Sequence, residues 1–159
     1  RAGVDGIGLP GGETTTLSLL LTPSGLFFAL AVRIEAGARV LATCAGLILL
    51  AAVVGAGRPD QRSFGVLDVS VLRNGYGRQR DSFETGLEIA GLAPGEGNAL
   101  FPAVFIRAPR ITRTGGGVEV LASVGADPVL VRQDGILAAA FHPELSGDPR
   151  LHQLFLGGI

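Results

Sequence analysis

The only cysteine in this 159-residue chain stands between a short apolar run and several small residues. Residues 40–43 lead into Cys44, and Ala45 and Gly46 follow it directly. A buried strand that turns sharply into a helix needs small neighbours and lifts the side chain at the turn out of the sheet. The helix N-terminus and its dipole would then favour a thiolate. We therefore predict that Cys44 is a nucleophile; the alternative is a small buried residue of the core.

A second candidate group is His142-Pro143-Glu144, close to the C-terminal end. The residue before a proline is pushed into an extended conformation. In extended backbone, residues two apart point to the same side. We therefore expect the Glu144 carboxylate beside the His142 imidazole, where it would hold the tautomer and stabilise the cation. A cysteine nucleophile requires such a base and orienting group; the alternative is a solvated loop end.

A third candidate is the turn at Pro10-Gly11-Gly12-Glu13. Paired glycines between a strand and a helix expose backbone N–H groups that can stabilise an oxyanion. The alternative is an ordinary tight turn. A phosphate-binding loop is disfavoured, because the spacing and the lysine of a P-loop are both absent.

The elements that must position these groups alternate between strand and helix in the first third of the chain. We predict a strand ending at Leu9, a helix through Leu21, a second helix over 26–35, a strand over 40–43 and a buried helix from Cys44 through Val54. Such alternation with apolar strands indicates a parallel sheet covered on both faces.

The remainder of the chain consists mainly of short runs with β character separated by turn residues. The runs cover 66–72, 83–89, 103–106, 118–123, 129–132 and 136–141. Asp134-Gly135 joins the last two tightly enough for a hairpin. Asp148 and Pro149 are the predicted N-cap and first position of a closing helix through Leu156.

Composition narrows the classes of function. The formal net charge of −1 provides no electrostatic case for nucleic acid or an anionic membrane. A single cysteine cannot form an internal disulfide, which fits a reducing, cytoplasmic location. Two histidines and one cysteine show no metal-ligand spacing. The length fits a single domain over 1–159. Because no initiator Met is present, we expect a chain that is cut at its start.

Six segments resemble, in the same order, the glutaminase subunits of pyridoxal 5′-phosphate synthase, which are class I (triad) glutamine amidotransferases. The cysteine turn and His-Pro-Glu are typical of the superfamily. Arg-Asn-x-Tyr-Gly-Arg-Gln and Phe-Ile-Arg-Ala-Pro are typical of this subunit. The matching segments are 9–15, 43–46, 73–79, 81–84, 104–109 and 141–145.

The resemblance implies an α/β fold, namely a three-layer α/β/α, flavodoxin-like arrangement with a mixed central sheet. The family opens with an apolar strand and a helix that have no counterpart in this chain. We therefore expect a single glutamine amidotransferase domain, N-terminally truncated, that lacks the first strand and helix.

The resemblance also implies a role for each matching residue. Cys44 matches the nucleophile, His142 the general base and acid, and Glu144 the orienting carboxylate. The backbone N–H groups of Gly12 and Ala45 match those that bind the oxyanion. The matching glutamine-binding residues are Gly11, Gly12, Glu13, Arg73, Ile106 and Arg107. Among these, an arginine suits the α-carboxylate of glutamine, and Glu13 suits its ammonium group.

The implied activity is hydrolysis of L-glutamine to L-glutamate and ammonia through a cysteine thioester. Ammonia would pass to the barrel-shaped synthase subunit of a hetero-oligomer that makes pyridoxal 5′-phosphate (vitamin B6). The expected partners are thus L-glutamine and that subunit, with no nucleic acid and no membrane. No cofactor is expected, because pyridoxal phosphate is the product of the complex. The alternatives are a catalytically silent relative that binds the synthase as a scaffold, and a class I glutaminase serving another acceptor.

Overall fold

A five-stranded mixed sheet forms the centre of the computed structural model, which describes residues 3–57, 59, 61–77 and 81–158. Across the sheet the strands are β1 (Gly6–Leu9), β2 (Arg39–Thr43), β10 (Ile136–Ala139), β9 (Asp127–Gln133) and β8 (Glu119–Val124). β1 and β10 both run parallel to β2, whereas β9 runs antiparallel to β10 and to β8. The predicted hairpin of the last two strands is therefore confirmed.

The parallel strands decide where the candidate residues meet. Leu9 of β1 lies opposite Ala42 of β2, and Ala139 of β10 lies opposite Thr43. The chain therefore leaves β1, β2 and β10 at the same edge of the sheet. The carboxyl edge of parallel strands is where α/β proteins place their ligands.

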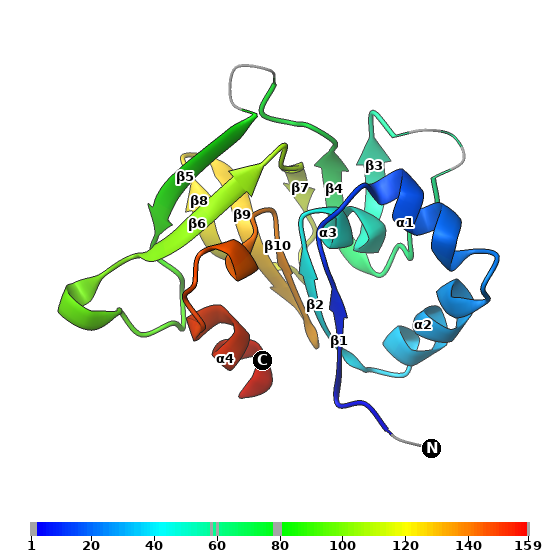
Figure 1. The fold of residues 1–159 in the computed structure, drawn as a ribbon, viewed down its shortest axis with the longest axis horizontal. Coiled ribbons are helices and arrows are strands. Elements are labelled where there is room, and N and C mark those ends of the chain that lie inside the picture. The colour runs from blue at the N-terminus through cyan, green and yellow to red at the C-terminus, as the bar shows by residue number, and fades with distance from the viewer. Residues whose placement is uncertain (1–2, 58, 60, 78–80, 159) are drawn as a thin grey trace.

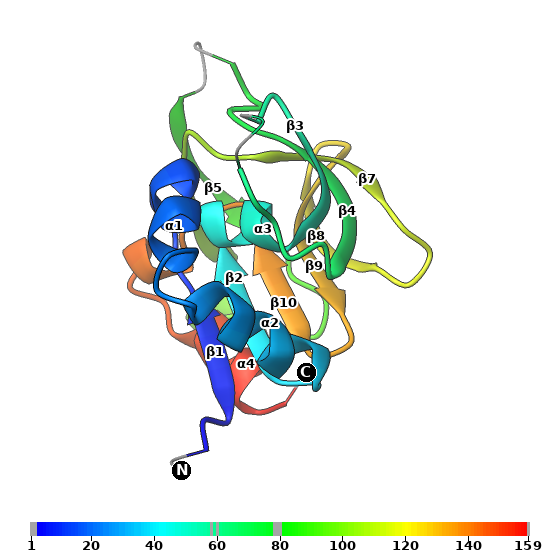
Figure 2. The same cartoon turned by 90° about the vertical axis from the view of Figure 1, so that its right-hand side faces the viewer.

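Helices cover both faces of this sheet. They are α1 (Thr14–Leu21), α2 (Leu26–Glu35), α3 (Ala45–Leu50) and α4 (Arg150–Leu156). Figure 1 shows α1, α2 and α3 to one side of β1 and β2 and α4 to the other side, and Figure 2 shows α1 and α2 in front of the sheet. The expected α/β/α layering with a mixed sheet is confirmed, as are the helices predicted before Leu21 and over 26–35.

The predicted helix from Cys44 through Val54 is wrong in its second half. α3 ends at Leu50, and the chain continues directly as strand β3 (Ala51–Gly55). β3 pairs in parallel with β4 (Leu67–Leu72), which pairs antiparallel with β7 (Arg110–Thr114). The β-branched residues of β3 favour a strand, and pairing with β4 satisfies backbone groups that a continued helix would have satisfied internally.

The other predicted strands are present within a few residues of their expected ends. β5 (Ser82–Leu87) and β6 (Phe101–Ile106) form a separate antiparallel pair, with the short 3₁₀ turn Glu96–Asn98 in the connection between them. β7 was not predicted. Only Ile111 of that strand is buried and two of its five residues are arginine, so its apolar pattern is weak.

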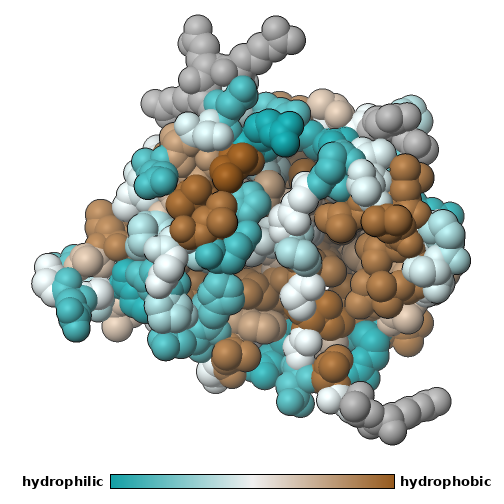
Figure 3. Space-filling model, viewed as in Figure 1, coloured by the Kyte–Doolittle hydropathy of each residue, from teal (hydrophilic) through white to brown (hydrophobic). Residues whose placement is uncertain are grey.

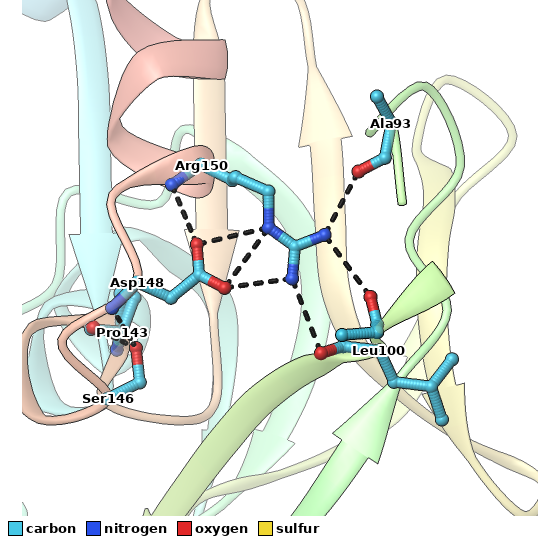
Figure 4. A network of polar contacts seen from close by, with 7 residues as sticks. Ala93, Leu100, Pro143, Ser146, Asp148 and Arg150 are labelled. Atoms are coloured by element: carbon cyan, nitrogen blue, oxygen red, sulfur yellow. Dashed lines mark hydrogen bonds and ion pairs between the residues drawn. The ribbon is translucent and has the colours of Figure 1, made fainter. Parts of the chain in front are cut away.

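The start of α4 differs by one residue from the prediction. The helix begins at Arg150, and Pro149, not Asp148, is its N-cap residue. Asp148 Oδ1 nevertheless accepts a hydrogen bond from the Arg150 N–H at 3.0 Å, and the carboxylate also accepts from the guanidinium. The same guanidinium donates to the carbonyls of Ala93, Ala99 and Leu100, so one arginine ties α4 to the β5–β6 connection (Figure 4).

Apolar side chains are exposed on α1 and α2, and Figure 3 shows apolar surface on that side of the molecule. The exposed members on these helices are Leu19, Leu20, Leu26, Phe28 and Val32. No single helix of the described residues has the length and apolar character of a membrane span; α1 and α2 meet that criterion only jointly, across a bend of 96°.

Candidate active site

A cavity of about 340 Å³ opens where β1 and β2 end, and its wall includes residues that follow β4 and β6. All the predicted site residues except Gly11 and Glu144 line this cavity. A larger cavity of about 650 Å³ lies beside β5, β6 and β8, and none of the predicted site residues lines it. The smaller cavity is therefore the candidate active site.

Cys44 occupies the predicted turn between β2 and α3. Its backbone has φ 49° and ψ −104°, an unfavourable conformation for a residue with a side chain. The Cys44 N–H donates to the Ala139 carbonyl at 2.8 Å, and Sγ lies 4.0 Å from the Ile106 carbonyl oxygen. A side chain at position 46 would overlap the Leu9 carbonyl, so the close approach of α3 to β1 requires Gly46. The predicted strand, sharp turn and helix around the cysteine are all present.

His142 and Glu144 lie side by side, as predicted, but for a different geometric reason. Nδ1 of His142 is 2.7 Å from Oε1 of Glu144. Residues Pro143–Leu145 form a 3₁₀ turn, and His142, with φ −107° and ψ 88°, precedes it. The tight turn, and not an extended chain, returns the Glu144 carboxylate to the imidazole.

The environment of His142 favours its cation. A hydrogen bond with the Cys44 side chain is the largest influence and raises the pKa of His142, and the Glu144 hydrogen bond raises it further. Burial of the ring acts in the opposite direction, and the resulting pKa is about 9 instead of 6.5. The three side chains therefore form a continuous series of contacts, Cys44 to His142 to Glu144. Such a series can generate a thiolate beside an imidazolium.

The two glycines of the Pro10–Glu13 turn have different positions. Gly11 packs against the His142 ring so closely that a side chain at position 11 would overlap the imidazole. Gly11 is not one of the residues that line the cavity. Gly12, with φ 149°, lines the cavity together with Ala45, the first residue of α3. Donation from these two backbone N–H groups to an oxyanion stays a prediction.

Glu13 and Arg73 place opposite charges side by side at the cavity. Oε1 of Glu13 is 3.1 Å from Nη2 of Arg73. The Glu13 carboxylate also caps α1, accepting from the Thr16 hydroxyl at 2.8 Å and from the N–H groups of Thr16 and Thr15 at 2.7 and 3.1 Å. Hydrogen bonds from Thr16 and Thr15 lower the pKa of Glu13 to about 2, so it is ionised at neutral pH. Adjacent fixed charges of opposite sign complement a zwitterionic amino-acid head group.

A further part of the wall comes from the last residue of β6 and from the residues that follow β4 and β6. Ile106 and Arg107 line the cavity, and Arg107 has φ 42°. Their contact with glutamine stays a prediction. Asn74, with φ 51°, also lines it and was not assigned a role from the sequence. Its place beside Arg73 and the tolerance of asparagine for left-handed backbone were the available signals. Arg78 and Gln79 of the matching 73–79 segment lie outside the described residues.

Two further wall residues, Thr14 and Ile48, were also missed. They belong to the first turns of α1 and α3, which follow the turns that were recognised. No set of three or more His, Cys, Asp or Glu side chains arranged for a metal ion was found within the described ranges.

The known proteins that are similar to this chain in sequence agree with those that are similar to it in structure. A curated relative from Frankia casuarinae, the pyridoxal 5′-phosphate synthase subunit PdxT, is 51% identical over 158 residues, which is 99% of this chain and 77% of the relative. The subunit of the same name from Thermotoga maritima is 52% identical over 153 residues, covering 96% of this chain and 78% of its own.

Solved structures agree with these sequence relatives. A crystal structure described as a glutamine amidotransferase matches 98% of this chain and 79% of its own, with a TM-score of 0.88 and 47% identity. A Thermoplasma acidophilum protein described as part of a GMP synthase shares the fold over 98% of this chain and 73% of its own, with a TM-score of 0.61 and 17% identity. The model of the SNO glutamine amidotransferase family matches residues 1–159. By that match and by the half-identical relatives, the chain belongs to the SNO glutamine amidotransferase family.

Proposed function

We propose that this chain is the glutaminase subunit of a pyridoxal 5′-phosphate synthase. It hydrolyses L-glutamine to L-glutamate and supplies the ammonia for synthesis of the cofactor. The observation that carries the proposal is the contact series Cys44–His142–Glu144 at a cavity that also presents Glu13 and Arg73. The half-identical relatives that bear this subunit's name support the assignment of the pathway.

Glutamine binds with its head group at Glu13 and Arg73. The Arg73 guanidinium binds the α-carboxylate, and the Glu13 carboxylate accepts a hydrogen bond from the α-ammonium group. The side-chain amide extends toward Cys44, and Ile106 and Arg107 enclose it from the end of β6. Because both head-group contacts are charged, the site favours free glutamine over a glutamine side chain within a polypeptide.

Acylation begins with attack of the Cys44 thiolate on the side-chain amide carbon of glutamine. The carbonyl oxygen becomes an oxyanion, which the N–H groups of Gly12 and Ala45 stabilise. His142, a cation in the resting enzyme, gives its proton to the amide nitrogen as the carbon–nitrogen bond breaks. Ammonia leaves, and the glutamyl group stays on sulfur as a thioester.

Deacylation reverses the role of His142. The neutral imidazole accepts a proton from water while the water oxygen attacks the thioester carbon. Collapse of the second oxyanion releases glutamate and regenerates the thiolate beside the imidazolium. Glu144 keeps the imidazole oriented in both steps through its hydrogen bond to Nδ1.

Ammonia released at the cavity passes, in this proposal, to a barrel-shaped synthase subunit in a hetero-oligomer. The Cys44 thiol must stay reduced to act as a nucleophile. We therefore place the enzyme in the cytoplasm, a reducing compartment.

Glutamate release from glutamine, with and without the synthase subunit of the same organism, tests the proposal. We expect wild-type activity in the complex and a loss of about 10³-fold or more in Cys44→Ala and His142→Ala. His152→Ala is the matched control, because His152 is the other histidine and lies in α4, outside the cavity. Equal release by Cys44→Ala and wild type would exclude this mechanism. A folded wild-type chain that binds the synthase and releases no glutamate would instead identify a scaffold.

A further inference from the structure

We infer that Gln61 is a positioning residue that holds the Arg73 guanidinium in the orientation that receives the α-carboxylate of glutamine. The inference rests on the proposed function, in which Arg73 binds that carboxylate. Gln61 lies between β3 and β4 and does not line the cavity, so it acts only through Arg73.

The contacts of Arg73 show what Gln61 contributes. Nη1 of Arg73 donates to Oε1 of Gln61 at 2.9 Å, and Nη2 donates to Oε1 of Glu13 at 3.1 Å. A third contact, from Nη1 to the Thr15 hydroxyl, is longer at 3.4 Å. Gln61 is thus the closest partner of the guanidinium, and it is neutral. It fixes the direction of the planar group and leaves the positive charge available for an anion.

The segment that carries Gln61 is anchored to the rest of the molecule. The Arg62 N–H donates to the Ser18 hydroxyl of α1 at 3.1 Å, and the Phe64 N–H donates to the Leu49 carbonyl of α3 at 2.6 Å. The Phe64 ring stacks on the Phe27 ring of α2, with centroids 4.3 Å apart. Gln61 is therefore attached to a braced segment, and a braced support lowers the cost of ordering a binding group when the ligand arrives.

The amide nitrogen of Gln61 provides a second argument. Nε2 is buried and has no hydrogen-bond partner among the described residues. An unsatisfied buried donor destabilises a protein, so packing alone would favour an apolar residue here. The carbonyl oxygen of the same amide accepts the hydrogen bond from Arg73. This contact explains why a polar residue stands here, although its buried amide nitrogen destabilises the fold. Such local conflicts are expected beside functional sites.

The decisive variant is Gln61→Leu, which removes the acceptor and keeps most of the side-chain volume. Loss of one hydrogen bond to a charged group should raise KM for glutamine about tenfold in the complex with the synthase. kcat should stay within about twofold, since Gln61 contacts neither Cys44 nor His142. Gln153→Leu is the matched control because Gln153 is exposed on α4. Gln61→Ala, assayed in the same way, replaces the leucine variant should that one fail to fold.

A double-mutant cycle separates positioning from a general structural role. In an Arg73→Ala background, Gln61→Leu should leave kcat/KM unchanged, because the group it positions is already absent. An unchanged KM in the single variant, or an equal further loss in the double variant, overturns the inference. A wild-type complex without glutaminase activity would overturn the proposed function itself, whereas an active wild type with unaffected Gln61 variants overturns only the role of Gln61.

Discussion

At the scale of single residues, the surroundings of His142 set its protonation state. Its neighbours Cys44 and Glu144 both stabilise the cation and raise its pKa to about 9. The proposed mechanism uses this cation to protonate departing ammonia. The pKa of His142 is therefore also expected to appear in the kinetics.

The pH dependence of kcat/KM for glutamine tests this link. Below about pH 9 His142 carries its proton, and as pH rises through that value the general acid is lost, so activity should fall. Glu144→Gln removes the carboxylate that stabilises the cation, so the alkaline limb should move to lower pH. Glu119→Gln, at an exposed ion pair with Arg132, should leave the profile unchanged. An alkaline limb at the same pH in Glu144→Gln and wild type would contradict the stabilisation of the His142 cation by the Glu144 carboxylate.

At the scale of elements, the turn between β2 and α3 depends on how closely two backbones approach. α3 begins directly after Cys44 and packs over the end of β1. Gly46 is the residue at the closest approach, because a side chain there would meet the carbonyl of Leu9. The position of the nucleophile is therefore a property of the packing of α3 on the sheet.

Gly46→Ala should destabilise the fold by about 3 kcal/mol, since the added methyl group must displace backbone. Urea unfolding followed by circular dichroism measures this change. Gly8→Ala is the matched control, because a side chain at position 8 of β1 would meet nothing within 4 Å, and it should change stability by about 0.5 kcal/mol or less. Similar stabilities for Gly46→Ala and Gly8→Ala would show that α3 can move away from β1 without strain.

At the scale of the whole molecule, segments far apart in sequence are held together by a few polar ties. The Asp148–Arg150 pair connects the start of α4 to the carbonyls of the β5–β6 connection (Figure 4). Hydrogen bonds from Arg150 lower the pKa of Asp148 below its usual value of 3.8. Its ionised form is therefore favoured by the folded state.

This pair predicts a pH-dependent contribution to stability. Because the folded-state pKa of Asp148 is lowered, the contribution is present above about pH 3.8 and is lost as pH falls below that value. Asp148→Asn should therefore unfold at lower urea concentration than wild type at pH 7, and the difference should shrink below pH 3.8. Asp134→Asn, exposed in the β9–β10 hairpin, is the control. A difference that is constant with pH would indicate that the Asp148 carboxylate contributes nothing through its charge.

The sequence by itself determined the candidate catalytic side chains and the local turns that carry them, because these depend on neighbouring residues. Small residues around Cys44 and the apolar run before it were sufficient for the strand and the sharp turn. The Glu13 carboxylate caps α1 by accepting from the N–H groups of Thr15 and Thr16, two and three positions further along the chain. The contacts of the Glu13 cap lie within three residues along the chain, so residue type and spacing carry the information. The residue types next to Cys44 likewise predict its turn, although the packing of Gly46 on Leu9 sets the position of that turn. The family resemblance then supplied the roles of Arg73, Ile106 and Arg107, for which the local pattern offered none.

Only the tertiary structure decided the strands β3 and β7 and the contacts of Arg73, because these features depend on contacts between segments that are distant in sequence. Residues 51–54 are as apolar as a buried helix, and pairing with β4 makes them a strand. β7 has a weak apolar pattern, and its antiparallel pairing with β4 defines it. The pairing of Glu13 with Arg73, and of Arg73 with Gln61, spans 60 and 12 positions, respectively. Hydrogen bonds across such separations depend on how the sheet and its helices assemble, and residue spacing does not encode that assembly.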